Sequence, residues 1–321
     1  MNKTNQSFTL RGSALSFITA SLKGISQVIL IENAISGLII LLAIMVSSIF
    51  EGIIALLSAF IGTFIGKIGG MEEQKVNQGL LGYNSVLTGM ALMLFLTGSN
   101  RWIFALGGAA IAAIFTAAIV YLMRNTGIPI LTFPFIVLTW IILLTPYKLH
   151  AINLSPELEP QNLSVLGPEL TEKVDFIEGI FNGIGQIYLL DEPLSGILLF
   201  VAVFFAGWKL GLYAILGNIT ALIFAYFLGA EHTLMMLGLY GYNAILTILA
   251  VSAVFNEKQN FLTVLIGIIS ACLAVLITAS VDALLIPFGL PALTMPFVLA
   301  TWIILCARKV MPFSNIKEKK F

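Results

Sequence analysis

The 321 residues of this chain are 59% hydrophobic and only 10% charged, and sixteen basic side chains balance sixteen acidic ones. A soluble globular domain carries about 25% charged residues, so this composition, with a mean hydropathy of +1.02, predicts a membrane protein. Zero net charge argues against a nucleic-acid partner, and two cysteines give neither a disulfide framework nor a metal site.

Five apolar runs occupy the first half of the chain. They cover residues 36–50, 53–68, 79–97, 102–123 and 128–145. A helix that crosses the bilayer needs about 20 apolar residues, but several of these runs are shorter and rich in Gly or Pro. We therefore expect tilted, broken or re-entrant helices among them.

A hydrophilic stretch, residues 148–175, follows these runs and contains five acidic residues, two lysines and three prolines. This composition predicts an exposed linker. Five further apolar runs come after it, and they cover residues 194–208, 210–228, 237–255, 261–286 and 290–307.

Basic residues gather near the two ends of the chain. They are Lys3, Arg11, Arg308, Lys309, Lys317, Lys319 and Lys320. Because positive charge favours the cytoplasmic side of a membrane, we predict that both termini are cytoplasmic and the linker is extracytoplasmic. Each half then crosses the membrane an odd number of times, which five spans and one non-spanning helix per half would satisfy.

Four short motifs occur twice in the same order, mostly 159 residues apart (186 − 27 = 159). They are GISQV and GIGQI around Gln27 and Gln186, ISG and LSG from Ile35 and Leu194, GYN at residues 82–84 and 241–243, and LTFPF and LTMPF at residues 131–135 and 293–297. We interpret residues 1–147 and 176–321 as two copies of one unit. An odd number of crossings inverts one copy relative to the other, and inverted repeats place one substrate path at their interface.

The repeated polar residues are the candidates for lining this path. Gln27 and Gln186 offer uncharged amides with donors and an acceptor; one such residue more often joins two helices, but the matched pair favours the pore. Thr132 and Thr294 lie beside prolines, whose freed carbonyls persist at membrane depth only when buried or facing water. Their hydroxyls could pass a solute between such carbonyls, or could only patch a broken helix.

The GYN motifs place an aromatic side chain beside an amide. Tyr83 and Tyr242 could flank a flat solute or could simply pack in the core. Asn84 and Asn243 are more typical of helix caps.

Ionisable residues are scarce within the apolar runs. Glu32 and Asp191 match across the copies, and Asp282 lies late in a long run. Charge is costly there, so we expect interfacial positions, with proton transfer as the alternative. The chain lacks phosphate-loop, metal-ligand and nucleophile-elbow motifs. We therefore predict neither an enzyme nor a cofactor, and transport that is downhill or coupled to an ion.

In their order, duplication and apolar context, these motifs resemble the urea transporter family over about residues 24–302. The resemblance implies an all-α membrane protein of two inverted repeats, each with about five transmembrane helices and a re-entrant helix. It further implies a homotrimer with one pore per protomer, a location in the plasma membrane (here a bacterial inner membrane) and passive conduction of urea.

The resemblance also implies roles for individual positions. Those that match substrate-contacting residues of the family are Gln27 and Gln186 at two outer sites, Thr132 and Thr294 in the narrow middle, Tyr83 and Tyr242 in an aromatic slot, and Leu87 and Leu246 along its aliphatic walls.

One departure from the family concerns the width of the slot. Leu30 and Leu189 stand three residues after the glutamines, where family members usually carry phenylalanine. Conduction of ammonia, a short amide or guanidine by the same scaffold is therefore one alternative to urea, and proton-coupled transport is another.

Overall fold

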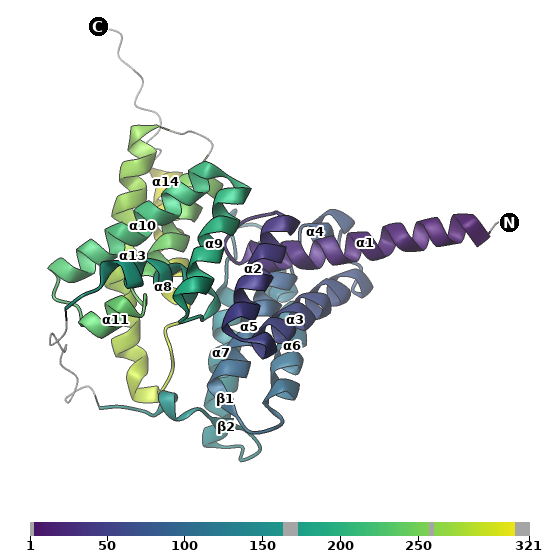
Figure 1. The fold of residues 1–321 in the computed structure, drawn as a ribbon, viewed down its shortest axis with the longest axis horizontal. Coiled ribbons are helices and arrows are strands. Elements are labelled where there is room, and N and C mark those ends of the chain that lie inside the picture. Colours follow the sequence, from purple (N-terminus) through teal and green to yellow (C-terminus); the bar gives the residue numbers. More distant parts are fainter. Residues whose placement is uncertain (1–2, 163–172, 257–259, 312–321) are drawn as a thin grey trace, which may run out of the picture.

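The computed structural model describes residues 3–162, 173–256 and 260–311, and most of them are helical (Figure 1). The first half comprises α1 (Lys3–Gln27), α2 (Ala34–Ser47), α3 (Ile49–Ile68), α4 (Glu73–Asn77), α5 (Gly82–Phe95), β1 (Leu96–Thr97), α6 (Arg101–Met123), α7 (Phe133–Leu144) and the 3-10 turn η1 (Thr145–Tyr147). The connection contains β2 (Asn153–Leu154) and η2 (Pro156–Leu158).

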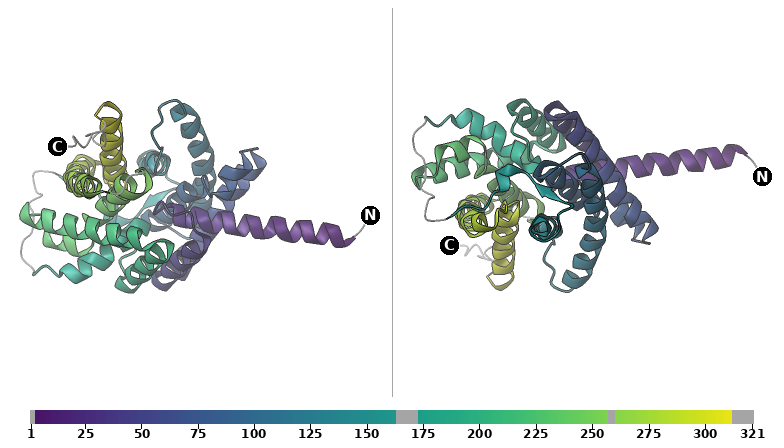
Figure 2. Two further views of the ribbon diagram at one scale, coloured as in Figure 1. Left: turned by 90° about the horizontal axis from the view of Figure 1, so that it is seen from above. Right: turned by 90° about the horizontal axis from the view of Figure 1, so that it is seen from below.

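The second half begins with α8 (Phe176–Gly185) and repeats the order of the first. It continues with η4 (Gln186–Tyr188), α9 (Pro193–Ala206), α10 (Trp208–Phe227), α11 (His232–Met236), α12 (Gly241–Ile248), the π-helical η5 (Leu249–Val254), α13 (Phe261–Leu285), η6 (Ile286–Phe288) and α14 (Met295–Val310). Helices α9 to α12 start 159 residues after α2 to α5 (193 − 34 = 241 − 82 = 159). The two halves lie side by side, while α1 extends away from the body towards the N-terminus (Figures 1 and 2).

Four of the described helices are long and apolar enough to cross a membrane, namely α3, α6, α10 and α13 with η6. The pair formed by α8 with η4 and by α9 is bent by 74°, as in a broken span or a re-entrant loop. Shorter apolar helices are α2, α5, α7 with η1, and α12 with η5. The prediction of an all-α membrane protein with short and broken helices among its apolar runs is confirmed.

Polar side chains cap several of these helices. Asn33 accepts hydrogen bonds from the first turn of α2, Ser48 caps α3, Asp175 caps α8 and Asn260 caps α13. The first N–H groups of a helix have no partner within the helix, and a capping side chain stabilises it by about 1 kcal/mol. These caps mark where the apolar runs are divided into separate helices.

Glycine in the repeated serine-glycine motif permits a close helix contact in each half. A Cβ atom on Gly37 would lie 2.0 Å from the carbonyl oxygen of Leu22, and one on Gly196 would lie 2.1 Å from that of Phe181. Both distances are far inside van der Waals contact, so α2 on α1, and α9 on α8, approach as closely as only glycine allows.

The serine of the same motif joins the two halves. Ser36 Oγ on α2 donates to the carbonyl of Ala202 on α9 at 2.9 Å, and Ser195 Oγ on α9 donates to the carbonyl of Ala43 on α2 at 2.8 Å. All four residues are buried. Each of the two helices therefore donates one serine hydrogen bond to a backbone carbonyl of the other.

The connection between the halves is more structured than the predicted exposed linker. β1 pairs antiparallel with β2, Leu158 is buried, and the N–H of Gln161 donates to the carbonyl of Ile286 at 3.2 Å. Residues 163–172 of the predicted linker lie outside the described residues. The hydrophilic composition of residues 148–175 as a whole conceals the few apolar side chains that pack against the second half.

Candidate functional site

One cavity in the first half collects the first copies of the repeated motifs. It has a volume of about 370 Å³, and its wall includes Gln27, Leu30, Tyr83, Leu131 and Thr132. These residues come from the end of α1, the turn after it, the start of α5 and the extended segment before α7. Four of them are predicted site residues, which the fold brings together from three separate parts of the sequence.

A second cavity, of about 500 Å³, collects the second copies. Its wall includes Gln186, Leu189, Tyr242, Leu293 and Asp282. The first four correspond to residues in the wall of the first cavity, whereas the counterpart of Asp282 is Val120 (282 − 162 = 120), which also lines the first cavity. The two cavities thus share the four repeated residues of their walls, but they differ in charge.

The two glutamines present the same end of their amide groups. Gln27 Nε2 donates to the carbonyl of Gln78 at 3.2 Å, and Gln186 Nε2 donates to Asp191 Oδ1 at 2.6 Å. In the part of the chain that the structure describes, no hydrogen bond engages either amide oxygen. Both glutamines therefore retain an unengaged acceptor.

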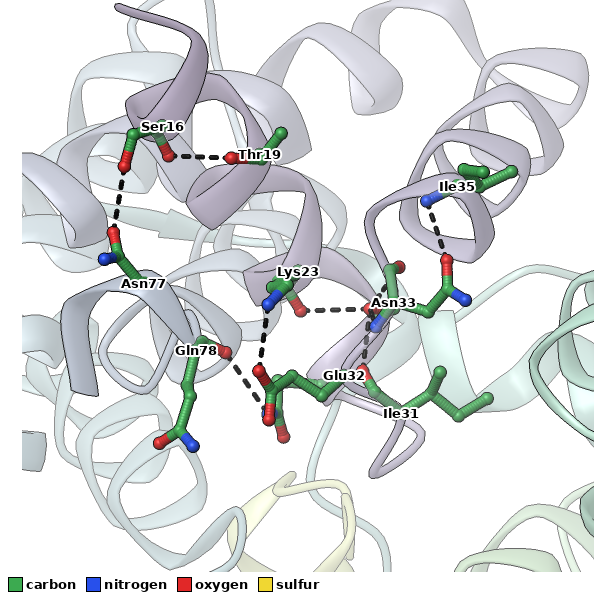
Figure 3. A network of polar contacts seen from close by, with 11 residues as sticks. Ser16, Thr19, Lys23, Ile31, Glu32, Asn33, Ile35, Asn77 and Gln78 are labelled. Carbon is green, nitrogen blue, oxygen red and sulfur yellow. Dashed lines mark hydrogen bonds and ion pairs between the residues drawn. The ribbon is translucent and has the colours of Figure 1, made fainter. Parts of the chain in front are cut away.

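The carboxylates that match across the copies have different partners. Glu32 forms an exposed ion pair with Lys23 at 2.9 Å (Figure 3). Asp191, its counterpart, lines the second cavity and accepts from Gln186. The two glutamines are consequently held by different kinds of group.

Four leucines adopt the left-handed backbone region, and all four line a cavity. Leu30 and Leu189 have φ of +60°, Leu131 has +51° and Leu293 has +52°. A residue with a Cβ is disfavoured there by about 1–2 kcal/mol, so surrounding contacts must hold these turns. Strained backbone of this kind tends to occur at functional sites, and among the described residues other than glycine it is found only at these corresponding positions of the two cavities.

The tyrosines hold two of these strained leucines in place. The Tyr83 hydroxyl donates to the carbonyl of Leu131 at 2.9 Å, and the Tyr242 hydroxyl donates to that of Leu293 at 2.5 Å. Both rings also line their cavities. Packing in the protein and facing a solute, which the sequence offered as alternatives, are therefore compatible.

The asparagines of the GYN motifs cap helices, although not the helices to which they belong. Asn84 Oδ1 accepts from the N–H of Phe135, in the first turn of α7, and Asn243 Oδ1 accepts from the N–H of Phe297, in the first turn of α14. Each asparagine lies near the start of α5 or α12. The expected capping function is present but acts between helices.

The two threonines meet where the halves touch. Thr132 Oγ1 and Thr294 Oγ1 lie 2.7 Å apart in a hydrogen bond, and the residues are only 2% and 3% exposed. Each directly follows a left-handed leucine of its own cavity wall. Thr132 lines the first cavity, whereas the described wall of the second cavity ends at Leu293 and does not include Thr294.

Two tryptophans, to which the sequence assigned no role, connect the two halves in the same region. Trp140 Nε1 donates to the carbonyl of Pro291 at 2.9 Å, and Trp302 Nε1 donates to that of Pro129 at 2.8 Å. Each bond crosses from one half to the other and satisfies a carbonyl of the extended segment before α7 or α14. The sequence signal that could have indicated this contact is a Thr-Trp pair that occurs in both halves, at Thr139-Trp140 and Thr301-Trp302.

The remaining predicted pair lies deeper in the protein. Leu87 and Leu246 are 1% and 0% exposed, and the described walls of the two cavities do not include them. Both belong to the hydrophobic core instead.

The walls of the two cavities carry opposite charges. Glu159, Asp191 and Asp282 line the second cavity without a described basic side chain, whereas Arg124 lines the first without a described acidic one. Asp282 is half-buried. Sequence reasoning did not single out Arg124 or Glu159, because neither belongs to a repeated motif.

Comparison with known proteins shows similarity over most of the chain. A family model described as urea transporter matches residues 18–309. Urea transporter 1 of Ovis aries is 26% identical over 298 residues, an alignment that covers 91% of this chain and 77% of that protein. Urea transporter 1 of Mus musculus is 26% identical over 304 residues, with the same two coverages.

Proposed function

This chain belongs to the urea transporter family, and we propose that it conducts urea through a single pore between its two halves. Facilitative transport of urea down its gradient follows from the family and from the relatives named as urea transporters. The observation that supports this path is the pair of matched cavities, together with the bond that joins Thr132 in the wall of the first cavity to Thr294, the residue after Leu293 in the wall of the second.

The chemistry of the cavities suits urea. Urea is planar and neutral, with four N–H donors and one carbonyl acceptor. The amide oxygens of Gln27 and Gln186 accept N–H groups at the outer sites, and the threonine hydroxyls accept or donate at the centre. Several modest sites replace the hydration of a solute without retaining it, while apolar walls reject hydrated ions.

The proposed architecture is two inverted repeats, residues 1–147 and 176–321, with five crossings and a re-entrant helix in each. The reciprocal bonds between α2 and α9, and those of the two tryptophans, support a two-fold relation between the halves. With both termini cytoplasmic, the first cavity opens to the cytoplasm and the second lies beneath the extracytoplasmic linker. The assembly that the family resemblance implies is a homotrimer in a plasma membrane, in bacteria the inner membrane.

Stopped-flow urea flux in vesicles containing the purified protein tests the proposed path. We expect Gln27→Leu and Gln186→Leu each to lower urea flux by about three- to tenfold, since each removes one hydrogen bond to the solute. Ser280→Ala is the matched control, because Ser280 is exposed and bonds only within α13.

The same assay separates urea conduction from the alternatives. Flux that follows the urea gradient and does not change with an imposed pH gradient supports passive conduction. Uphill accumulation driven by the pH gradient would instead show proton coupling, and normal urea flux in both glutamine variants would refute the proposed path.

A further inference from the structure

The Gln186 amide has a fixed orientation because of its partner. Its Nε2 lies 2.6 Å from Asp191 Oδ1. An ionised carboxylate can only accept hydrogen bonds, so the amide nitrogen, and not the oxygen, must face Asp191. A hydrogen bond to an ionised acceptor is also shorter and stronger than one between neutral groups.

The other end of this amide is left for the solute. Gln186 and Asp191 both line the second cavity, and Gln186 Nε2 is already engaged. One N–H of Nε2 and the amide oxygen remain available, and the oxygen, which points away from Asp191, is an acceptor that suits an N–H group of urea.

We propose that Asp191 is a positioning residue for substrate recognition: it locks the Gln186 amide so that Oε1 accepts an N–H group, which makes this cavity selective for solutes with N–H donors. This inference rests on the proposed role of Gln186 as a urea ligand. Asp191 itself acts through Gln186.

In the described part of the first half, the corresponding glutamine has no carboxylate partner. Gln27 donates to a neutral carbonyl at the longer distance of 3.2 Å, and Glu32, the counterpart of Asp191, pairs with Lys23 instead (Figure 3). Gln27 therefore has the same amide orientation but a weaker restraint. The two outer sites are unequal, and the second one discriminates more strongly.

A structural role of Asp191 in its helix is small. The N-cap position of α9 is Glu192, whose side chain makes no capping bond. Asp191 precedes it and is exposed. Substitution of Asp191 therefore leaves the start of α9 intact.

The test compares two inhibitors of urea flux that differ in donors: formamide, which has N–H groups, and N,N-dimethylformamide, which has none. We expect Asp191→Ala to raise the half-saturating urea concentration and the inhibition constant of formamide by about three- to tenfold. The inhibition constant of N,N-dimethylformamide stays within twofold. Asp191→Glu, which keeps the carboxylate, restores part of the discrimination, and Glu32→Ala serves as the matched control without effect.

If Asp191 positions Gln186, Asp191→Ala weakens inhibition by formamide but not by N,N-dimethylformamide, whereas a general change of the cavity would alter inhibition by both. Equal shifts for both inhibitors, or no shift for either, would overturn the inference. If Asp191→Ala does not fold, Asp191→Asn provides the same comparison, with a smaller effect because its amide oxygen still accepts from Gln186. Normal urea flux in Gln186→Leu would refute the proposed role of Gln186 as a urea ligand. Reduced flux in Gln186→Leu, together with unchanged inhibition in Asp191→Ala, would refute only the role of Asp191.

Discussion

The hydroxyls of Thr132 and Thr294 lie 2.7 Å apart, so a urea molecule cannot pass between them in this arrangement. On the proposed path the pair must separate, and each hydroxyl then exchanges its bond to the other threonine for a bond to urea. Such an exchange changes the free energy little, because each broken hydrogen bond is replaced. The centre of the path is therefore closed by groups that can also receive the solute.

Replacing one hydroxyl upsets this exchange. We expect Thr132→Val or Thr294→Val to lower urea flux by about tenfold, since the loss of one hydrogen bond is about 0.5–1.5 kcal/mol. Thr132→Ser keeps the hydroxyl and should retain most of the flux. Stopped-flow measurements on the two single variants and the double variant give the coupling between the residues; wild-type flux in Thr132→Val would exclude a role for its hydroxyl.

Sequence analysis could identify these side chains but not the backbone that presents them. The repeats singled out Gln27, Thr132 and their counterparts because polar residues at matched positions in apolar runs are conspicuous. Leu131 and Leu30 carry no such signal, since leucine rarely adopts positive φ. Their conformation depends on tertiary contacts such as the bond from Tyr83 to the carbonyl of Leu131.

At the level of helices, the contact of α2 with α1 and that of α9 with α8 depend on one glycine each. A methyl group on Gly37 or Gly196 would overlap a backbone oxygen, at 2.0 or 2.1 Å, and the helices would have to move apart. We expect Gly37→Ala and Gly196→Ala to destabilise the protein by about 1–3 kcal/mol, seen as a lower unfolding temperature in detergent. Gly107→Ala, on α6 with no atom within 4 Å of the added methyl group, is the matched control, and an equal effect there would contradict this explanation.

Helix boundaries were partly predictable for a physical reason. Asn33, which precedes the apolar run 36–50, and Ser48, which lies within that run, cap α2 and α3. A cap acts over only a few residues of sequence, so its side chain is a local signal. The pairing of β1 with β2 was not predictable, because it joins segments more than 50 residues apart (154 − 96 = 58) through two residue pairs. Leu158 was missed for the same reason, since its burial depends on a partner in the other half.

The whole molecule combines matched halves with unmatched charge. Several bonds that cross between the halves occur in reciprocal pairs, as for Ser36 and Ser195, whereas Asp282 faces the second cavity where Val120 faces the first. A neutral solute such as urea interacts only weakly with this difference. A cation of similar shape would bind preferentially to the acidic cavity.

Guanidinium, a planar cation close to urea in size, tests this asymmetry as an inhibitor of urea flux. Removing one nearby charge changes the binding energy by about 1 kcal/mol or more, so Asp282→Asn should raise the inhibition constant of guanidinium by about five- to tenfold. Asparagine has nearly the same shape as aspartate without its charge, and urea is neutral, so we expect the half-saturating urea concentration to stay within twofold. Val120→Asp places a carboxylate at the matched position of the first cavity and should strengthen inhibition. Equal inhibition of the wild type and both variants would mean that the charge of Asp282 does not reach the solute path.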